Sequence, residues 1–196
     1  MCDSLVMNAN DFERYDGLIF DCDGTLADSM PVHYVAWRET MSRYGIEFKE
    51  DRFYSMGGMP SAKIVALLSG EHGVDVDPEA VAAEKETQFQ SLIDQVQPMA
   101  AVCEIAAAFH GKKPMAVASG SGRVVVEKQL VALGIDHWFS VVVTSEDTQR
   151  HKPEPDVFLE AARRIEVKPE NCVVFEDSPL GFQAAQAAGM DWVDVR

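Results

Sequence analysis

Five short apolar runs recur along the chain, and each has the composition of a buried β-strand. They are rich in Val, Ile and Phe and show little alternation of apolar with polar residues, as expected of strands that are covered on both faces. The runs are Gly17–Cys22, Pro114–Ser119, Val141–Thr144, Cys172–Glu176 and Trp192–Val195. The pattern predicts a sheet that lies in the interior of the protein.

Helical patterns occupy the segments between the last four of these runs. The predicted helices are Val124–Leu133, Asp156–Ile165 and Leu180–Ala188. Gly134 and Gly189 directly follow two of them, where a glycine commonly ends a helix, and Pro155 suits the first turn of the other. Alternation of strands with helices predicts parallel strands, so we assign the chain to the α/β class, with a Rossmann-like, doubly wound parallel sheet.

The stretch between the first two strands is helical and shows no strand pattern. From Met30 to Gln97 the predicted helical segments are Val32–Tyr44, Ser61–Leu68 and Pro78–Val96. Asp28 and Ser29 can cap the first of these, with Pro31 in its opening turn. The stretch is too long for a crossover connection and too periodic for a loop.

We therefore predict an α-helical cap subdomain, residues 30–96, inserted into a core formed by residues 1–29 and 97–196. The insertion enters at the carboxyl end of a strand, which is where open α/β sheets bind their ligands. This position predicts that the insertion acts as a lid over a binding site.

Composition narrows the possible partners. The chain has 196 residues, of which 47% are hydrophobic, which suffices for one medium domain or a core with an insertion. Its 17 Lys and Arg against 32 Asp and Glu give a formal net charge of −15. Binding to nucleic acid or to an anionic membrane depends on basic patches, so we expect neither partner. Any phosphate-bearing ligand must be held by local cations.

The cysteines and the apolar runs indicate the cellular location. Cys2, Cys22, Cys103 and Cys172 have no spacing typical of a metal site and are expected to be reduced thiols. The first ten residues show no signal-peptide pattern, and no apolar run approaches the length of a membrane span. We therefore expect a cytoplasmic protein that does not bind membranes.

The most informative residues, Asp21-Cys22-Asp23-Gly24-Thr25, stand at the end of the first predicted strand. Residues at i and i+2 of a strand share a face, so Asp21 and Asp23 are predicted to point the same way. Neighbouring buried carboxylates repel each other, which favours a cation between them, and Mg²⁺ prefers oxygen ligands. The alternative is an ordinary polar turn, because Asp and Gly are common turn residues.

Three further polar clusters fall at the carboxyl ends of predicted strands. They are Ser119-Gly120-Ser121-Gly122, the segment His151-Lys152-Pro153-Glu154-Pro155, and Glu176-Asp177-Ser178-Pro179. Hydroxyls and N–H groups at a helix start suit an anion, although such clusters are often plain turns. Lys152 could be a solvated surface charge, and Ser178 could cap the next helix. Convergence of all these groups on one edge of one sheet favours a Mg²⁺ site beside a phosphate site.

The order and the types of these residues resemble the haloacid dehalogenase superfamily of phosphotransferases. Asp21-Cys22-Asp23-Gly24-Thr25 is similar to the first motif of the family, Ser119 to the second, Lys152 to the third and Glu176-Asp177 to the fourth. The resemblance covers nearly the whole chain. The helical insertion resembles the cap of the β-phosphoglucomutase-like subgroup, and within that subgroup the chain is most similar to small phosphatases of fructose 1-phosphate.

The resemblance implies a Mg²⁺-dependent phosphatase that hydrolyses small sugar phosphates through an aspartyl-phosphate. Asp21 would be the nucleophile, and Asp23 would act as general acid and then as general base. Ser119, Gly120 and Lys152 would hold the phosphoryl oxygens. The implied metal ligands are Asp21, Asp23 through its backbone carbonyl, Glu176 and Asp177, with Glu176 binding directly or through water.

Substrate contacts are implied in both parts of the chain. The candidates are Thr25, His33, Gly58, Lys63, Lys85 and Gly120. Thr25 would orient the network of the first motif. Gly58 lies in a loop, Gly57-Gly58-Met59-Pro60, that is similar to the specificity loop of the family, although its glycines could equally form a plain turn between helices. A histidine on a helix is usually structural, and Lys85 could equally be a solvated charge.

Two alternatives stay open beside the phosphatase. A hexose-phosphate mutase of the β-phosphoglucomutase type would share every core residue, but members of that kind carry an Arg in the cap loop where this chain has Ser61. A phospho-ligand sensor is the alternative without catalysis, and it would not need both Asp21 and Asp23. The sequence identifies neither the sugar nor the oligomeric state, for which we expect a monomer or a weak dimer.

Overall fold

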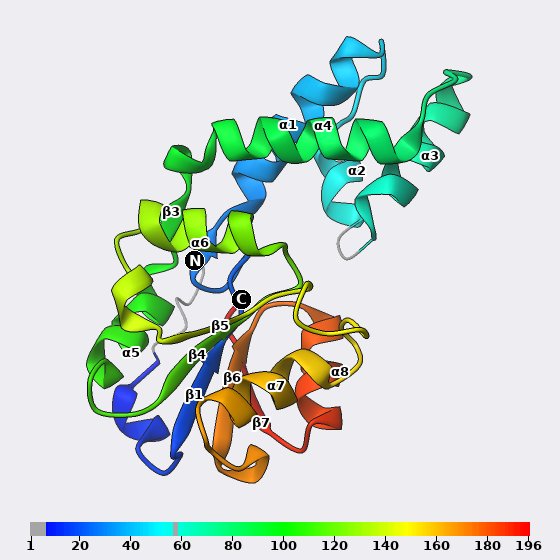
Figure 1. Ribbon diagram of the computed structural model, residues 1–196. Coiled ribbons are helices and arrows are strands. Elements are labelled where there is room, and N and C mark those ends of the chain that lie inside the picture. Colours follow the sequence, from blue (N-terminus) through cyan, green and yellow to red (C-terminus); the bar gives the residue numbers. More distant parts are fainter. Residues whose placement is uncertain (1–6, 57–58) are drawn as a thin grey trace. The chain divides into compact units, whose positions relative to one another are not determined.

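The computed structural model describes residues 7–56 and 59–196, and the chain divides into two compact units (Figure 1). The core unit comprises Met1–Asp28 and Gln97–Arg196, and the cap unit comprises Ser29–Val96. Each unit has its own apolar cluster.

Five parallel strands form the sheet of the core unit, in the order β5-β4-β1-β6-β7. They are β1 (Gly17–Phe20), β4 (Met115–Ala118), β5 (Val141–Val143), β6 (Cys172–Glu176) and β7 (Asp191–Asp194). β1 is central, and its residue Leu18 lies opposite Met115 of β4 and Val173 of β6. The chain first builds outward on the β4 side and then on the β6 side, which makes the carboxyl end of β1 a topological switch point. The predicted α/β class and doubly wound sheet are confirmed.

Both faces of the sheet are covered, which explains the continuous apolar runs. Ile19 lies in an apolar cluster with Phe158 of α7 (Asp156–Arg164) and Ala184 of α8 (Pro179–Ala187). On the opposite face Phe20 stacks on Phe175, with 4.7 Å between the ring centroids. Figure 1 shows α5 (Ala100–Phe109) and α6 (Arg123–Ala132) on the side of the sheet away from α7 and α8.

The cap unit consists of helices packed on one another. They are α1 (Met30–Arg43), α2 (Glu50–Ser55), α3 (Ser61–His72) and α4 (Pro78–Ser91), followed by the short 3₁₀ helix η2 (Ile93–Gln95). Its apolar cluster is built around Trp37, Phe53 and Leu68. None of the helices in the described parts of the chain has the length and apolar character that crossing a bilayer requires.

Several predicted boundaries were wrong. β1 ends at Phe20 rather than Cys22, and the predicted helix Pro78–Val96 is α4 followed by η2. The stretch from Met30 to Gln97 was predicted to hold no strand, but Gln97 begins β3 (Gln97–Pro98), which pairs antiparallel with β2 (Ala27–Asp28) at the two crossings between the units. Helices α2 and α5 were not predicted.

The two predicted glycine helix ends are confirmed, whereas the predicted cap of the first cap helix is not. Gly134 and Gly189 follow the last residues of α6 and α8 with φ of 70° and 73°, as expected of glycines that end helices. Ser29 does stand directly before α1, but its side chain makes no capping hydrogen bond. Pro155 is the residue before α7 rather than part of its first turn.

Candidate active site

The chain leaves β1 at Phe20 and immediately forms a tight turn. The carbonyl oxygen of Cys22 accepts hydrogen bonds from the N–H groups of Thr25, Leu26 and Ala27. Because the strand ends before Asp23, the alternation that predicted a common direction for Asp21 and Asp23 does not extend that far. Gly24 has φ of +81°, and a Cβ at this position would overlap the carboxylate of Asp177. Glycine therefore permits both the turn and the close approach of the turn to Asp177.

Three carboxylates converge where β1 and β6 end. Asp21, Glu176 and Asp177 each place one oxygen within 4.8 Å of the others. Asp21 and Glu176 are buried, with exposed fractions of 5% and 1%. A set of donors made only of carboxylate oxygens suits a hard divalent cation such as Mg²⁺. The structure thus brings together the side chains of three of the four predicted metal ligands.

Lys152 is the counter-charge of this cluster. It lies in the loop between β5 and α7, and its Nζ donates to Oδ1 of Asp21 at 2.6 Å and to Oε1 of Glu176 at 3.2 Å. Only 11% of the lysine side chain is exposed. The alternative of a solvated surface charge is therefore wrong for Lys152, whose ammonium group belongs to the carboxylate cluster.

Burial and mutual repulsion shift the protonation equilibria of the cluster. Burial, followed by the nearby Glu176, raises the pKa of Asp21 well above its ordinary value. The same two causes raise the pKa of Asp177 to about 6. Burial alone would lower the pKa of Lys152, but the charges of Asp21 and Glu176 outweigh it and raise that pKa. One ammonium group among three carboxylates leaves an excess of negative charge that a divalent cation would neutralise.

Glu176 is fixed by donors on both of its oxygens. Ser178 Oγ donates to Oε1 at 2.6 Å, and the N–H of Asp177 donates to Oε2 at 3.0 Å. Ser178 also accepts from the N–H of Gly181 at the start of α8, which confirms its predicted capping role. A Cβ at Gly181 would overlap the Glu176 carboxylate, so this helix can approach only with glycine there.

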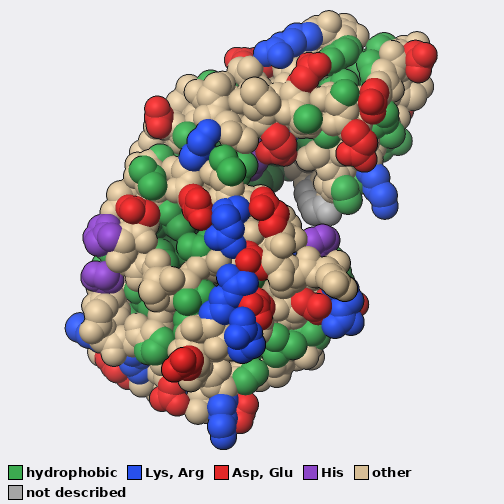
Figure 2. All heavy atoms as spheres, in the orientation of Figure 1, with side chains coloured by type: hydrophobic (Ala, Val, Ile, Leu, Met, Phe, Trp, Pro, Cys, Tyr) green, Lys and Arg blue, Asp and Glu red, His purple; other side chains and the backbone are tan. Residues whose placement is uncertain are grey.

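Asp147 anchors the loop that carries Lys152. Its Oδ2 accepts from the N–H of Thr144 at 2.8 Å and from Arg123 at 2.6 Å, and its Oδ1 accepts from Arg164 at 2.9 Å. Burial would raise the pKa of Asp147, but these donors outweigh it and lower the pKa to about 2. Figure 2 shows acidic and basic side chains intermixed over the face of the core that carries α7.

The serine–glycine loop after β4 reaches the same edge of the sheet. The N–H of Ser119 donates to Val143 of β5, and Ser119 is only 1% exposed. Gly120 is exposed, and the space that its Cβ would fill is open. The N–H of Arg123, in the first turn of α6, donates to Oε1 of Glu146 at 2.9 Å. Part of the predicted anion site at this helix start is therefore already occupied by a carboxylate of the chain.

Two residues that were not predicted as site residues hold the side chain of Asp23. Ser121 Oγ donates to Asp23 Oδ2 at 2.6 Å, and Gln129 Nε2 donates to Asp23 Oδ1 at 2.9 Å. Among the described residues, the carboxylate group with metal-ligand geometry consists of Asp21, Glu176 and Asp177, without the side chain of Asp23. The signal for Gln129 was a polar residue on the face of α6 that also carries Val125 and Val126.

Thr25 is completely buried in the turn after β1. Within the described parts of the chain its Oγ1 has no hydrogen-bond partner. Its predicted role in orienting the first-motif network stays a prediction. The thiols of Cys22, Cys103 and Cys172 are free and buried, and Cys2 lies outside the described residues.

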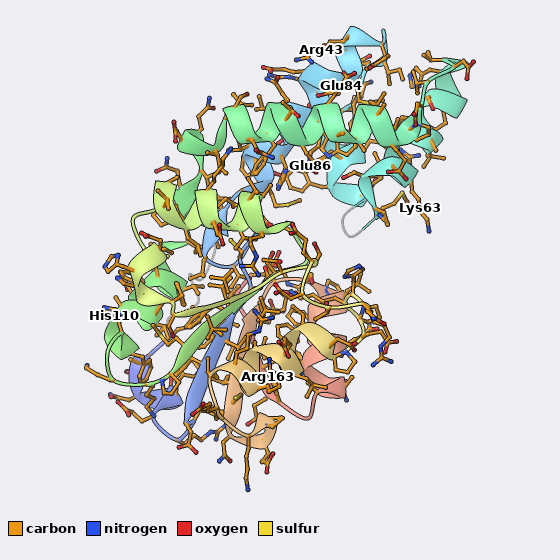
Figure 3. All side chains as sticks on the ribbon, in the orientation of Figure 1. Arg43, Lys63, Glu84, Glu86, His110 and Arg163 are labelled. Carbon is orange, nitrogen blue, oxygen red and sulfur yellow. The ribbon has the colours of Figure 1, made fainter. Side chains whose placement is uncertain are left out.

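In the cap unit, the buried Lys85 contacts the half-buried His33. Lys85 Nζ lies 3.0 Å from Nδ1 of His33 and 2.9 Å from Oε1 of Glu86, which Figure 3 labels on α4. The His33 ring stacks on Phe89, with 3.7 Å between centroids. Lys85 is only 3% exposed, so the alternative of a solvated charge is wrong for it. Substrate binding by either residue stays a prediction.

The remaining cap candidates lie around the start of α3. Lys63, labelled in Figure 3, is exposed in the first turn of this helix. Ser61, which was predicted to stand at the place of the mutase-type arginine, is the first residue of α3 and is half-buried. Gly58 lies outside the described residues.

The family model of haloacid dehalogenase-like hydrolases matches residues 18–195, nearly the whole chain. The chain belongs to this family. The resemblance that the motifs indicated is therefore confirmed, and the carboxylate cluster, Lys152 and Ser119 of this haloacid dehalogenase-like hydrolase lie within the matched region.

Two curated relatives of this haloacid dehalogenase-like hydrolase are sugar phosphatases. The fructose-1-phosphate phosphatase YqaB of Escherichia coli is 44% identical and covers 94% of this chain and 98% of its own length. The phosphorylated carbohydrates phosphatase of Thermotoga maritima is 28% identical over 90% of this chain and 82% of its own. The crystal structure of β-phosphoglucomutase from Clostridium difficile matches with a TM-score of 0.77 at 24% identity, over 92% of this chain and 84% of that one, which shows a shared fold.

Proposed function

We propose that the protein is a Mg²⁺-dependent phosphatase of small sugar phosphates, with fructose 1-phosphate foremost. The observation that carries the proposal is the convergence of Asp21, Glu176 and Asp177 with Lys152 at the switch point of the sheet. The two sugar-phosphate phosphatases among the relatives support the same reaction class, and the higher identity of YqaB supports a ketose 1-phosphate.

In the first step, an oxygen of Asp21 attacks the phosphorus, and the bond from phosphorus to the sugar oxygen breaks. The electron pair of that bond stays with the sugar oxygen, which takes a proton from Asp23. In the second step Asp23 takes a proton from water, whose oxygen attacks the aspartyl-phosphate. The bond between Asp21 and phosphorus then breaks, which releases inorganic phosphate and restores both carboxyl groups.

The neighbouring residues serve the same two steps. Lys152 offsets the charge of Asp21 and binds the phosphoryl oxygens, together with Ser119 and the backbone of Gly120. Asp21, Asp177 and the backbone carbonyl of Asp23 would hold Mg²⁺, with Glu176 bound directly or through water. Bound Mg²⁺ supplies positive charge that lets an anionic nucleophile approach an anionic phosphate. The all-oxygen donors and the excess negative charge of the cluster support this choice of metal.

The experiment measures both products from one set of substrates. The purified protein with Mg²⁺ is offered fructose 1-phosphate, 6-phosphogluconate, a hexitol phosphate and β-glucose 1-phosphate with a bisphosphate primer. Release of inorganic phosphate, greatest from fructose 1-phosphate and lost in Asp21→Asn, is the expected result. Formation of glucose 6-phosphate faster than release of phosphate would make the protein a mutase. Binding of these esters without turnover of any of them would make it a sensor.

A further inference from the structure

Gln129 is a buried polar residue on an otherwise apolar face of α6. Its exposed fraction is 0%, and the neighbouring buried residues of the helix are Val125, Val126 and Leu130. Burial of an amide in apolar surroundings is unfavourable unless its polar atoms are hydrogen-bonded. Stability alone would favour an apolar residue at this position.

The two ends of the Gln129 amide differ in their contacts. Nε2 donates to Oδ1 of Asp23 at 2.9 Å, whereas Oε1 is buried and has no partner among the described residues. The amide is thus satisfied only on the side that faces Asp23. An amide oxygen left without a partner lowers stability, so the hydrogen bond to Asp23 is obtained at some loss of stability.

Gln129 and Ser121 together hold both oxygens of Asp23 from outside the metal cluster. Ser121 donates to Oδ2 from the loop after β4, and Gln129 donates to Oδ1 from the second turn of α6. The clustered carboxylate oxygens belong to Asp21, Glu176 and Asp177. The two donors therefore separate the side chain of Asp23 from the carboxylates that would bind a metal.

We propose that Gln129 is a positioning residue that holds the Asp23 carboxyl group where it can exchange a proton with the substrate, away from the metal ligands. This inference rests on the proposed function, in which Asp23 protonates the leaving oxygen. Gln129 touches neither the reacting phosphorus nor the sugar in this assignment and acts through Asp23. Loss of the Gln129 hydrogen bond should therefore lower kcat/KM most for substrates whose leaving oxygen must be protonated, and least for substrates whose leaving group departs as an anion.

The test compares two substrates whose leaving groups differ in this need. The sugar alkoxide of fructose 1-phosphate leaves only with a proton, whereas p-nitrophenolate leaves readily without one. The quantity compared is kcat/KM, because it reports only the steps up to and including the first irreversible one, which here is the transfer of the phosphoryl group to Asp21. Gln129→Met removes the donor at nearly constant volume. It is expected to lower kcat/KM for fructose 1-phosphate about tenfold or more, and to leave that for p-nitrophenyl phosphate within about twofold.

Thermal unfolding of the same variant separates positioning from stability. Because Gln129→Met also removes the amide oxygen that has no partner, its Tm is expected to equal or exceed that of the wild type. Val131→Met, on the exposed side of the same helix, is the matched control and should change neither kcat/KM nor Tm. Equal losses of kcat/KM on both substrates, or no loss on fructose 1-phosphate, would overturn the assignment of Gln129.

Asp23→Asn distinguishes failure of this inference from failure of the proposed function. It should show the same substrate selectivity as Gln129→Met, with a larger loss on fructose 1-phosphate. If Asp23→Asn loses activity on both substrates equally, the proposed role of Asp23 as general acid is wrong, and the role of Gln129 falls with it. If Asp23→Asn is selective and Gln129→Met is not, only the inference about Gln129 is wrong.

Discussion

Nζ of Lys152 lies 2.6 Å from Oδ1 of Asp21, and this contact joins the loop after β5 to the first residue beyond β1. The lysine thereby brings a positive charge to the proposed nucleophile. Burial and the charges of Glu176 and Asp177 outweigh this effect, so the pKa of Asp21 stays well above its ordinary value. The cluster is thus arranged for reactivity at some loss of stability of the metal-free protein.

Asp21→Asn is expected to raise stability and abolish turnover in the same protein. The substitution removes one buried negative charge from a group of three at nearly constant volume, so Tm in the absence of metal should increase. Loss of the nucleophile should lower kcat for fructose 1-phosphate by about a thousandfold or more. Thermal unfolding in chelator and an assay of phosphate release in Mg²⁺ provide the two measurements. A Tm below that of the wild type would contradict this electrostatic account of the cluster.

The stabilisation by Mg²⁺ is expected to depend on pH through Asp177. Its pKa is raised to about 6, because burial and Glu176 disfavour the charged form. A folded-state pKa above the unfolded value means that the metal-free protein loses stability as pH rises toward about 6, where Asp177 ionises. Mg²⁺ binds the ionised form, so the increase in Tm on adding Mg²⁺ should be small at about pH 5 and large at about pH 7.5.

The control for this pH dependence is Asp177→Asn, whose side chain stays neutral across the same range. Its response to Mg²⁺ should be weaker at the higher pH and should change less between the two values. An equal increase in Tm at both pH values in the wild type would show that ionisation of Asp177 does not limit metal binding.

The sequence predicted the core of the fold because both faces of its central strands are covered, so that every residue of such a strand is buried. All residues of β1, β4 and β6 are buried, and such strands leave continuous apolar runs. The two-residue strands β2 and β3 leave no such pattern. The six-residue helix α2 is too short for a clear period, whereas α5 is rich in Ala and its buried residues, among them Val102, Ile105 and Phe109, do follow a helical period.

The candidate site was predictable where residues follow directly from strand ends. Asp21, Ser119 and Glu176 are of this kind, since parallel strands bring their carboxyl ends to one edge. The partners of Asp23 were not predictable, because the contact from Gln129 depends on how α6 packs and on the rotamer of a buried side chain. Occupation of the start of α6 by Glu146 likewise depends on the path of a loop.

Asp147 is expected to contribute to stability near neutral pH and to lose that contribution in acid. Its side chain is 14% exposed, and its donors hold its pKa at about 2, below the ordinary value. A depressed pKa gives stability that is present above about pH 4 and is lost as pH falls toward about 2. Asp147→Asn should therefore lower the free energy of unfolding by about 2 kcal/mol at neutral pH, and by less as the pH falls through this range.

Urea unfolding at a series of pH values measures this difference. The control is Asp136→Asn, because Asp136 is 54% exposed and its contact with His137 is long, at 3.9 Å. Surface substitutions of this kind usually change stability by less than about 0.5 kcal/mol. A difference between wild type and Asp147→Asn that stays constant down to about pH 2 would show that the carboxylate charge is not the source of the stability.

Gly181→Ala is expected to weaken metal binding, although Gly181 has no side chain and is not itself a metal ligand. A Cβ at this position would overlap the Glu176 carboxylate, which must then move away from Ser178 and Lys152. Disturbance of residues that orient metal ligands typically weakens metal affinity by about tenfold to a hundredfold. The Mg²⁺ concentration for half-maximal activity should rise accordingly, while kcat at saturating Mg²⁺ falls less.

Gly70→Ala is the matched control, because Gly70 also lies inside a helix but has open space around its Cβ position. Gly70→Ala should gain about 1 kcal/mol of stability from helix propensity and keep the wild-type response to Mg²⁺. If Gly181→Ala also keeps the wild-type Mg²⁺ dependence, the close approach of Gly181 to the Glu176 carboxylate does not set the geometry of the metal ligands.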